Sequence, residues 1–211
     1  MSTQAAATAR ASVWEGGQSP YATNSKKFGM WLFIISDALT FSALLFAYTY
    51  SRVSNPDWPK PFEFTPAIIF SSVMTFALLT SSLTMVMAVH SMNAGNRGAT
   101  AKWILATMVA GGTFVALHLT EWMKLINEEH VTPFQNPWGV PLFGATFFAI
   151  TGLHMTHVVI GIIYLGIICQ AVVRGKFKAE DVEVAGLYWH FVDLVWMFVF
   201  PLVYLMSARV G

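Results

Sequence analysis

Ionisable side chains recur at a fixed spacing within otherwise apolar stretches of this sequence of 211 residues. Three pairs are separated by three positions, so both members of each pair lie on one face of a helix. The pairs are His118 with Glu121, His154 with His157, and His190 with Asp193, and Asp37 is a further single acid. Imidazole and carboxylate groups bind metals, exchange protons and form hydrogen bonds, so these residues are the candidates for chemistry.

Three interpretations of these residues are open. They could form hydrogen bonds between helices, worth about 0.6 kcal/mol each in membranes. They could handle protons or contact a lipid headgroup, because intramembrane ionisable groups mark such sites. They could also bind haem or a di-iron centre through His154, His157, His118 and Glu121. The single acid of that set and its order, histidine before glutamate, disfavour the metal site. The expected depths in the membrane also disfavour the metal site. Glu121 is expected near the outer surface of the membrane, whereas His190 and Asp193 are expected in its inner half.

The composition of the chain places these residues in a membrane protein. Hydrophobic residues make up 55% of the chain and charged residues only 11%, whereas soluble domains are about 25% charged. The net charge of +1 leaves no basic field for nucleic acid. Cys169 is the single cysteine, so no intrachain disulfide or multi-cysteine metal site can form. We interpret it as a small buried hydrophobe.

Five apolar stretches reach the length of about 20 residues that a membrane helix needs. We therefore predict an all-α, polytopic membrane protein with five transmembrane helices in a bundle. The predicted spans are 28–50, 67–90, 101–123, 141–173 and 186–208, within one domain of residues 28–211. The fourth would measure about 50 Å against a hydrocarbon core of about 30 Å, so it is expected to tilt or to project. Residues 1–27 are expected to be a flexible cytoplasmic segment without a secretory signal.

The distribution of Lys and Arg predicts the orientation in the membrane. With the N-terminus inside, the inner segments hold eight of the 12 Lys and Arg residues. Cytoplasmic loops carry the excess of these residues, so the N-terminus is expected inside and the C-terminus outside. Trp31, Trp103 and Trp189 would then lie near the inner interface and Trp122 near the outer one, as in an aromatic belt.

Smaller polar and apolar signals concern helix packing. Seven hydroxyl side chains of the second span are expected to bond to carbonyls one turn back or to a neighbouring helix. They are Ser71, Ser72, Thr75, Thr80, Ser81, Ser82 and Thr84. In the fourth span, Gly152, Gly161 and Gly166 are expected to permit close approach of other helices.

Four stretches of the chain resemble subunit III of the haem–copper oxidases. Residues 151–161, Thr-Gly-Leu-His-Met-Thr-His-Val-Val-Ile-Gly, are similar to the family's Thr-Gly-x-His-Gly-x-His-Val-x-x-Gly. Residues 29–37 are similar to Gly-Met-x-Leu-Phe-Ile-x-Ser-Glu, and Glu121-Trp122 is similar to the family's Glu-Tyr. The most specific signature resembles residues 188–196 and is carried by Tyr188, Trp189, His190, Phe191, Asp193 and Trp196. The resemblance covers all five spans and is closest to the short, five-helix bacterial form.

The resemblance implies an accessory, non-redox subunit of a respiratory terminal oxidase. No catalytic residue, cofactor or metal is then expected in this chain, and haem and copper lie in the partner catalytic subunit I. The family further implies location in the bacterial cytoplasmic membrane and contacts with other oxidase subunits, and it leaves membership of a respiratory supercomplex open. It implies structural phospholipid bound between the first two and the later helices, and support of proton uptake and durable turnover. The electron donor, cytochrome c or quinol, is chosen on other subunits.

Two positions depart from the family pattern. Asp37 stands where the family has a membrane-buried Glu, and Met155 stands where it has Gly. The shorter acid keeps a titratable group but leaves its proton role open. The alternatives to the oxidase subunit are a subunit III-like protein of a nitric oxide reductase system, a free-standing haem or di-iron membrane enzyme, and a small transporter. The last is disfavoured because the sequence has no internal repeat.

Overall fold

The computed structural model of the chain describes residues 25–63 and 68–209. Its five long helices are α1 (Ser25–Ser54), α2 (Ile69–Asn93), α3 (Arg97–Asn127), α4 (Pro141–Val173) and α5 (Ala179–Val199). A π turn, η2 (Phe200–Tyr204), and a 3-10 turn, η3 (Leu205–Ser207), continue α5. Two short strands, β1 (Phe62–Glu63) and β2 (Ala208–Arg209), pair in parallel. Five helices are long and apolar enough to cross a membrane, which confirms the predicted five-helix, all-α class.

The helices extend beyond the apolar stretches that predicted them. Helix α1 begins at Ser25 rather than at position 28, and α5 begins at Ala179 rather than at 186. Hydropathy marks only the part of a helix that lies in hydrocarbon, whereas polar first turns such as Lys26-Lys27 remain helical. Helix α4 has the bounds that were predicted. The expected flexible segment up to position 24 and the expected start of the second span at Ala67 lie outside the described residues.

Local signals set the short turns at one end of the molecule. The side chain of Asn96 caps α3 by accepting a hydrogen bond from the Ala99 amide at 3.0 Å. Gly95 and Gly175 follow the ends of α2 and α4 with φ values of 78° and 72°. In both turns, backbone amides that follow the helix bond back to carbonyls of its last turn. This motif requires a residue in the left-handed backbone conformation, which glycine adopts without steric cost.

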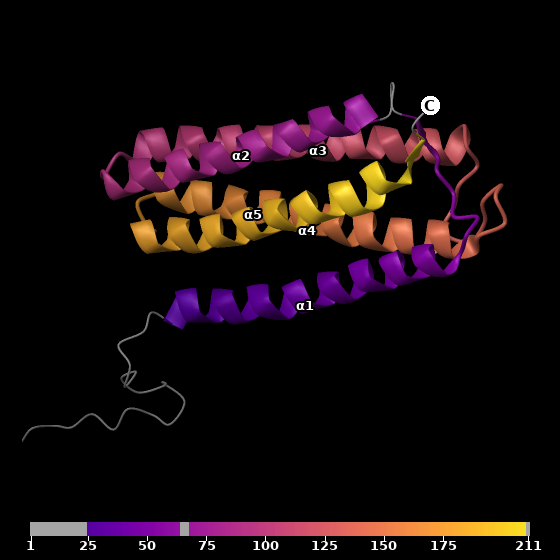
Figure 1. The fold of residues 1–211 in the computed structure, drawn as a ribbon. Coiled ribbons are helices and arrows are strands. Elements are labelled where there is room, and N and C mark those ends of the chain that lie inside the picture. Colours follow the sequence, from indigo (N-terminus) through magenta and orange to yellow (C-terminus); the bar gives the residue numbers. More distant parts are fainter. Residues whose placement is uncertain (1–24, 64–67, 210–211) are drawn as a thin grey trace, which may run out of the picture.

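Helices α2 to α5 form a closely packed bundle, and α1 lies at its edge against α4 and α5 (Figure 1). In the most apolar window of α1 only 6% of the residues are buried, compared with 50% for the window of α5. Helix α5 is therefore the centre of the bundle. Helix α1 presents most of its apolar surface outward, as suits a helix next to lipid or another subunit.

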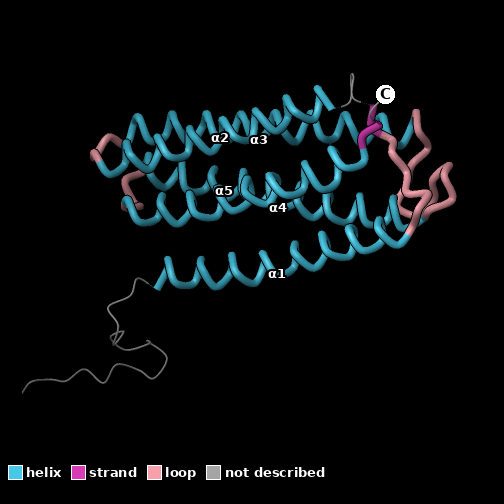
Figure 2. The backbone as a smooth tube through the Cα atoms, in the orientation of Figure 1, coloured by secondary structure: helices cyan, strands magenta, loops and turns pink. Residues whose placement is uncertain are grey.

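The two ends of the bundle differ. At the end where α1 begins, the turns that join α2 to α3 and α4 to α5 are short (Figure 2). At the opposite end the connections are longer, and the β1–β2 pairing joins the segment after α1 to the end of the chain. The hydroxyl of Tyr48 shares a hydrogen bond with Ser207 Oγ at 2.7 Å at that end. The described chain thus begins and ends on opposite sides of the bundle.

Candidate functional site: buried polar groups between the helices

Asp37 of α1 faces His157 of α4. Their atoms Oδ2 and Nε2 are 3.2 Å apart, and the two side chains are only 13% and 12% exposed. The other ring nitrogen of His157 lies 2.8 Å from the carbonyl oxygen of Leu153. The ring of Phe41 covers the pair, with its centroid 5.4 Å from that of the imidazole. Asp37 therefore points into the bundle rather than at lipid.

The imidazole of His157 is oriented by a contact within its own helix. A carbonyl oxygen only accepts, so Nδ1 donates its hydrogen to Leu153. Nε2 then faces Asp37 Oδ2 at 3.2 Å, but the contact is not a hydrogen bond, and this oxygen has no hydrogen-bond partner in the described residues. The structure thus brings an acid of α1 and an imidazole of α4 side by side within the bundle.

Glu121 of α3 is the second buried acid, at 6% exposure. Its two oxygens accept hydrogen bonds from two different helices, Oε1 from Ser71 Oγ and Oε2 from Tyr204 Oη, each at 2.7 Å. The Nδ1 atom of His118 is 3.9 Å from Oε2, too far for a hydrogen bond. Glu121 therefore ties α2, α3 and the end of α5 together.

The π turn η2 positions Tyr204 for this contact. Pro201 has no amide hydrogen and its ring obstructs an ordinary helical bond, so the helix widens at this residue. The Leu205 amide accordingly bonds back to the Phe200 and Pro201 carbonyls. The Tyr204 side chain is fully buried against the rings of Phe62 and Phe147.

His154 is fully buried among aromatic rings. Its imidazole stacks on Trp196 at a centroid distance of 5.1 Å and meets Phe114 edge-on at 5.7 Å. Neither of its ring nitrogens has a hydrogen-bond partner in the described part of the chain. The ring of His118 lies against the same Phe114 and Trp196, and His157 is turned towards Asp37.

The metal hypothesis required His118, Glu121, His154 and His157 to converge on one point. Within residues 25–63 and 68–209, no three His, Cys, Asp or Glu side chains come together as a ligand set. A di-iron site needs such convergence of ligands. The described residues therefore do not favour a free-standing di-iron enzyme.

Asp193 of α5 contacts a different part of α2. Its Oδ2 accepts a hydrogen bond from Ser82 Oγ at 2.8 Å. Ser82 and Ser71 are 11 positions apart on α2, which corresponds to about 16 Å along the helix. The acids Glu121 and Asp193 thus occupy separate depths, as the sequence suggested.

The aromatic residues that surround Asp193 also bond to other helices. Trp189 Nε1 donates to Ser81 Oγ at 2.9 Å, and Trp196 Nε1 donates to Thr75 Oγ1 at 3.0 Å. The hydroxyl of Tyr188 donates to the His157 carbonyl of α4 at 3.0 Å. Phe191 is buried against the cluster at 6% exposure. The Tyr-Trp-His-Phe-x-Asp-x-x-Trp stretch is thus a set of contacts from α5 to α2 and α4.

The expectation that Trp189 belongs to an interfacial aromatic belt was wrong. This side chain is 1% exposed. A Cβ atom added to Gly111 of α3 would lie 2.5 Å from the indole, and one added to Gly161 of α4 would lie 3.0 Å from it. The indole ring fills the space that these two glycines leave between α3 and α4, and its N–H donates to Ser81 of α2. Trp31, at 51% exposure, does face outward.

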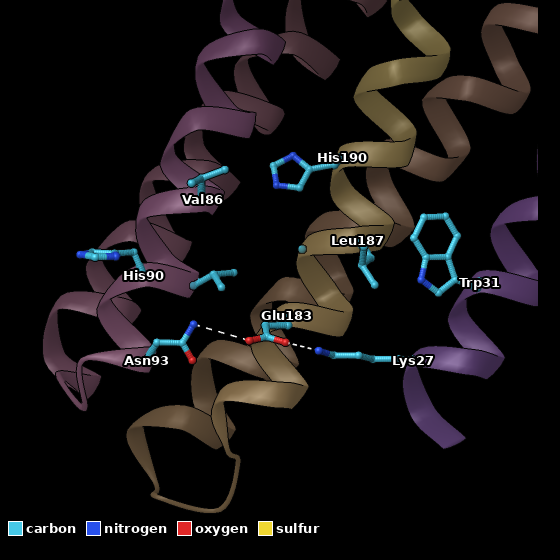
Figure 3. A pocket seen from close by; sticks show the side chains of 10 residues that line it. Lys27, Trp31, Val86, His90, Asn93, Glu183, Leu187 and His190 are labelled. Atoms are coloured by element: carbon cyan, nitrogen blue, oxygen red, sulfur yellow. Dashed lines mark hydrogen bonds and ion pairs between the residues drawn. The ribbon is translucent and has the colours of Figure 1, made fainter. Parts of the chain in front are cut away.

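His190 lies apart from the other predicted residues and lines a groove between α1, α2 and α5 (Figure 3). The cavity measures about 540 Å³. At its mouth, Glu183 of α5 forms an ion pair with Lys27 of α1, and Asn93 of α2 donates to the same carboxylate at 3.5 Å. His190 points from α5 towards α2 in this view.

Several of these partners were not singled out by the sequence. Tyr204 follows Pro201, where the π turn changes the rotation per residue. A regular helical spacing therefore does not predict which face of the helix carries Tyr204. The acids Asp181 and Glu183 pair with Lys26 and Lys27 at the start of α1. The signal for these pairs was present in the sequence. Lys26 and Lys27 precede the first predicted span, and Asp181 and Glu183 are two of three acids that precede the last one, on the side predicted to be inside. The predicted hydroxyl stripe of α2 does bond both to its own carbonyls and to neighbouring helices.

Comparisons with known proteins match most of the chain. A family model described as cytochrome c oxidase subunit III matches residues 5–208. Cytochrome c oxidase subunit 3 of Alkalihalophilus pseudofirmus is 31% identical over 87% of this chain and 88% of its own length. Quinol oxidase subunit 3 of Bacillus spizizenii is 33% identical over 85% of this chain and 86% of its own length. Cytochrome c oxidase subunit 3 of Pelomedusa subrufa is 32% identical over 92% of this chain and 75% of its own, longer sequence.

Proposed function

We propose a function from one premise, which is that the chain belongs to the cytochrome c oxidase subunit III family. It is an accessory subunit of a haem–copper terminal oxidase and contributes to aerobic electron transport without a redox centre of its own. Haem and copper belong to the catalytic subunit I beside it. The observation that carries this function is the match of the family to residues 5–208, which includes every transmembrane helix.

The partners follow from the same premise. The chain lies beside subunit I and other oxidase subunits in the bacterial cytoplasmic membrane, with its N-terminus inside. The outward apolar surface of α1 supports a neighbour within the membrane. Matches to both a cytochrome c oxidase and a quinol oxidase support the family and leave the donor to the other subunits.

The experiment that tests this function is purification of the full chain, tagged at its C-terminus, from membranes in a mild detergent. A haem-containing subunit should accompany it in constant ratio, with the absorption spectrum of reduced haem in the same fractions. Deletion of the gene should lower the number of turnovers that the remaining oxidase completes before it loses activity. A chain that purifies alone, without haem protein, would contradict the proposal.

The Asp37–His157 pair is the part of this chain that supports proton uptake. Its support is the approach of Asp37 Oδ2 to His157 Nε2 at 3.2 Å and the position of the two side chains between α1 and α4. Phospholipid held along the helices stabilises the contact with subunit I. The lipid contribution is supported by the grooves that border α1.

A further inference from the structure

Two histidines in the core of the bundle have polar atoms that no neighbouring group satisfies. The side chains of His118 on α3 and His154 on α4 are both 0% exposed. Their four ring nitrogens, and Nε1 of the neighbouring Trp122, are buried without a hydrogen-bond partner in the part of the chain that the structure describes. Buried polar groups of folded proteins nearly always have a partner, either in the protein or in an ordered water. These five atoms therefore need a partner.

The five atoms belong to one region between α3, α4 and α5. Phe114 and Trp196 each contact both imidazoles, with distances between ring centroids of 5.1 to 5.7 Å. The ring of Trp122 lies 5.6 Å from that of His118. Because the two imidazoles share the same aromatic neighbours, their nitrogens form a single polar region within the apolar core.

The aromatic neighbours cannot satisfy these nitrogens. Phe114 stacks on His118 with an angle of 20° between the planes, and Trp196 stacks on His154 with an angle of 27°. A stacked ring covers the face of an imidazole, whereas the N–H bond and the lone pair of its nitrogens lie in the ring plane. Neutral imidazole has one donor and one acceptor nitrogen, and indole has one donor. The region therefore offers three donors and two acceptors to a polar ligand.

Glu121 places a further acceptor beside this region. Its Oε2 atom is 3.9 Å from Nδ1 of His118, beyond a direct hydrogen bond but within reach of one bridging water. Oε2 accepts from Tyr204 Oη at 2.7 Å and has a second lone pair. A water can donate one hydrogen to Oε2 and either accept from Nδ1 or donate its other hydrogen to it. Both tautomers of His118 are thus compatible with the bridge.

Water matches the chemistry of the region better than other ligands do. No three His, Cys, Asp or Glu side chains converge within residues 25–63 and 68–209, so the region does not provide a metal ligand set. The five nitrogens are covered within the chain itself, so a group of a partner subunit does not reach them. A buried water needs two to four polar partners and is both donor and acceptor, as this mixture of N–H groups and bare nitrogens requires.

We propose that this region is a binding site for internal water, held by His118, His154 and Trp122. One water bridges Nδ1 of His118 to Oε2 of Glu121, and further water binds the nitrogens of His154. The waters extend the hydrogen bonds that Glu121 forms with α2 and η2 into a network that reaches α4. They are bound by this chain alone, so the site is independent of the contacts with subunit I.

The experiment is solid-state NMR of the full chain in lipid bilayers, with nitrogen-15 in its histidine and tryptophan side chains. It measures the transfer of magnetisation from water protons to these nitrogens. A background variant with His90→Gln, His130→Asn and His190→Gln removes the histidines that are exposed or that line the groove. Three histidines then remain, so the measurement does not depend on a substitution in the core.

The imidazole nitrogens of His118 and His154 and the indole nitrogen of Trp122 should receive magnetisation from water. The matched control is Nε1 of Trp189, which is 1% exposed and donates to Ser81 Oγ at 2.9 Å. Transfer to the Trp122 indole should be several-fold faster than transfer to the Trp189 indole, because only the first N–H bonds to water. Single replacements by phenylalanine assign each signal.

Transfer to the core nitrogens that is no faster than transfer to Trp189 would overturn the proposal. Of the three remaining histidines, only His157, whose side chain is 12% exposed, would then receive magnetisation. The bridge has its own variant, Glu121→Leu, which removes the acceptor. It should slow transfer to His118 several-fold and leave transfer to His154 unchanged. Unchanged transfer to both histidines would overturn the bridge.

Discussion

At the scale of single residues, each buried acid has a distinct partner. Asp37 faces His157, Glu121 receives two hydroxyl hydrogen bonds, and Asp193 receives one from Ser82. Neither Asp37 nor Glu121 forms an ion pair with Lys or Arg in the described residues. At Glu121 and Asp193, hydroxyl donors supply the hydrogen bonds that a buried carboxylate requires.

Two variants of Asp37 distinguish a role in proton uptake from a role in helix packing. Asp37→Asn should assemble normally, because the new amide can donate to the bare Nε2 of His157, but its proton uptake should be slower. Asp37→Leu leaves Nε2 of His157 without a polar neighbour and should lower the free energy of unfolding by about 1 kcal/mol. The measurements are proton uptake by the reconstituted oxidase and unfolding of the chain in mixed micelles. Loss of assembly in Asp37→Asn would assign the acid a purely structural role.

The Glu121 contact can be tested with a pair of tyrosine variants. Tyr204→Phe removes one of the two donors to the carboxylate and should destabilise the chain by about 0.6–1.7 kcal/mol. Tyr50→Phe is the control, because Tyr50 is 66% exposed. Unfolding in mixed micelles, followed by tryptophan fluorescence, measures both. Equal stabilities of the two variants would refute a stabilising bond between Tyr204 and Glu121.

At the scale of secondary structure, α5 organises the bundle through its aromatic residues. Trp189 lies between glycines of α3 and α4, and Trp196 stacks on His154 while it bonds to α2. Each indole thus combines a large apolar contact with one directed hydrogen bond. Gly111 of α3 and Gly161 of α4 leave the space that the Trp189 ring occupies.

The contact between Gly111 and the Trp189 ring can be tested by adding a methyl group at Gly111 or, as a control, at its neighbour Gly112. Gly111→Ala places its Cβ atom 2.5 Å from the Trp189 ring, whereas Gly112→Ala meets nothing within 4 Å. The first should destabilise the chain by about 1–3 kcal/mol through overpacking. The second should be neutral or stabilising by up to about 1 kcal/mol, because alanine favours helix. Thermal unfolding of both variants decides, and Trp189→Phe should partly rescue the first.

At the scale of the whole molecule, α1 is held to the bundle at three levels. Ion pairs connect it to α5 at one end, the Asp37–His157 pair connects it to α4 in the middle, and Tyr48 bonds to Ser207 at the other end. Two cavities border α1 at its ion pairs with α5, and a third lies deeper between the same two helices. The molecule is thus a closely packed bundle of four helices with a fifth attached by polar contacts.

The predicted orientation can be measured with single cysteines in a Cys169→Ala background. Ala94→Cys lies in the short turn after α2, on the side predicted to be inside, and Gln135→Cys lies in the loop before α4 on the opposite side. A membrane-impermeant thiol reagent applied to intact cells should label position 135 alone. Labelling of position 94 should require permeabilised membranes. The reverse pattern would invert the orientation.

The sequence alone determined the features that depend on local composition. Five apolar stretches implied five helices, because a bilayer leaves a backbone of that length no other way to satisfy its hydrogen bonds. The i, i+3 spacing placed His118 and Glu121 on one face of a helix, and ordered motifs indicated the family. The length of α4 also followed from its uninterrupted apolar run.

Only the tertiary structure decided which residues meet. Asp37 and His157 are 120 positions apart in the chain, and Glu121 and Tyr204 are 83 positions apart. Pairing at such separations depends on the rotation and depth of each helix, and these are set by side-chain packing rather than by hydropathy. For this reason Trp189 was expected at an interface and lies in the core, where Gly111 and Gly161 make room for it.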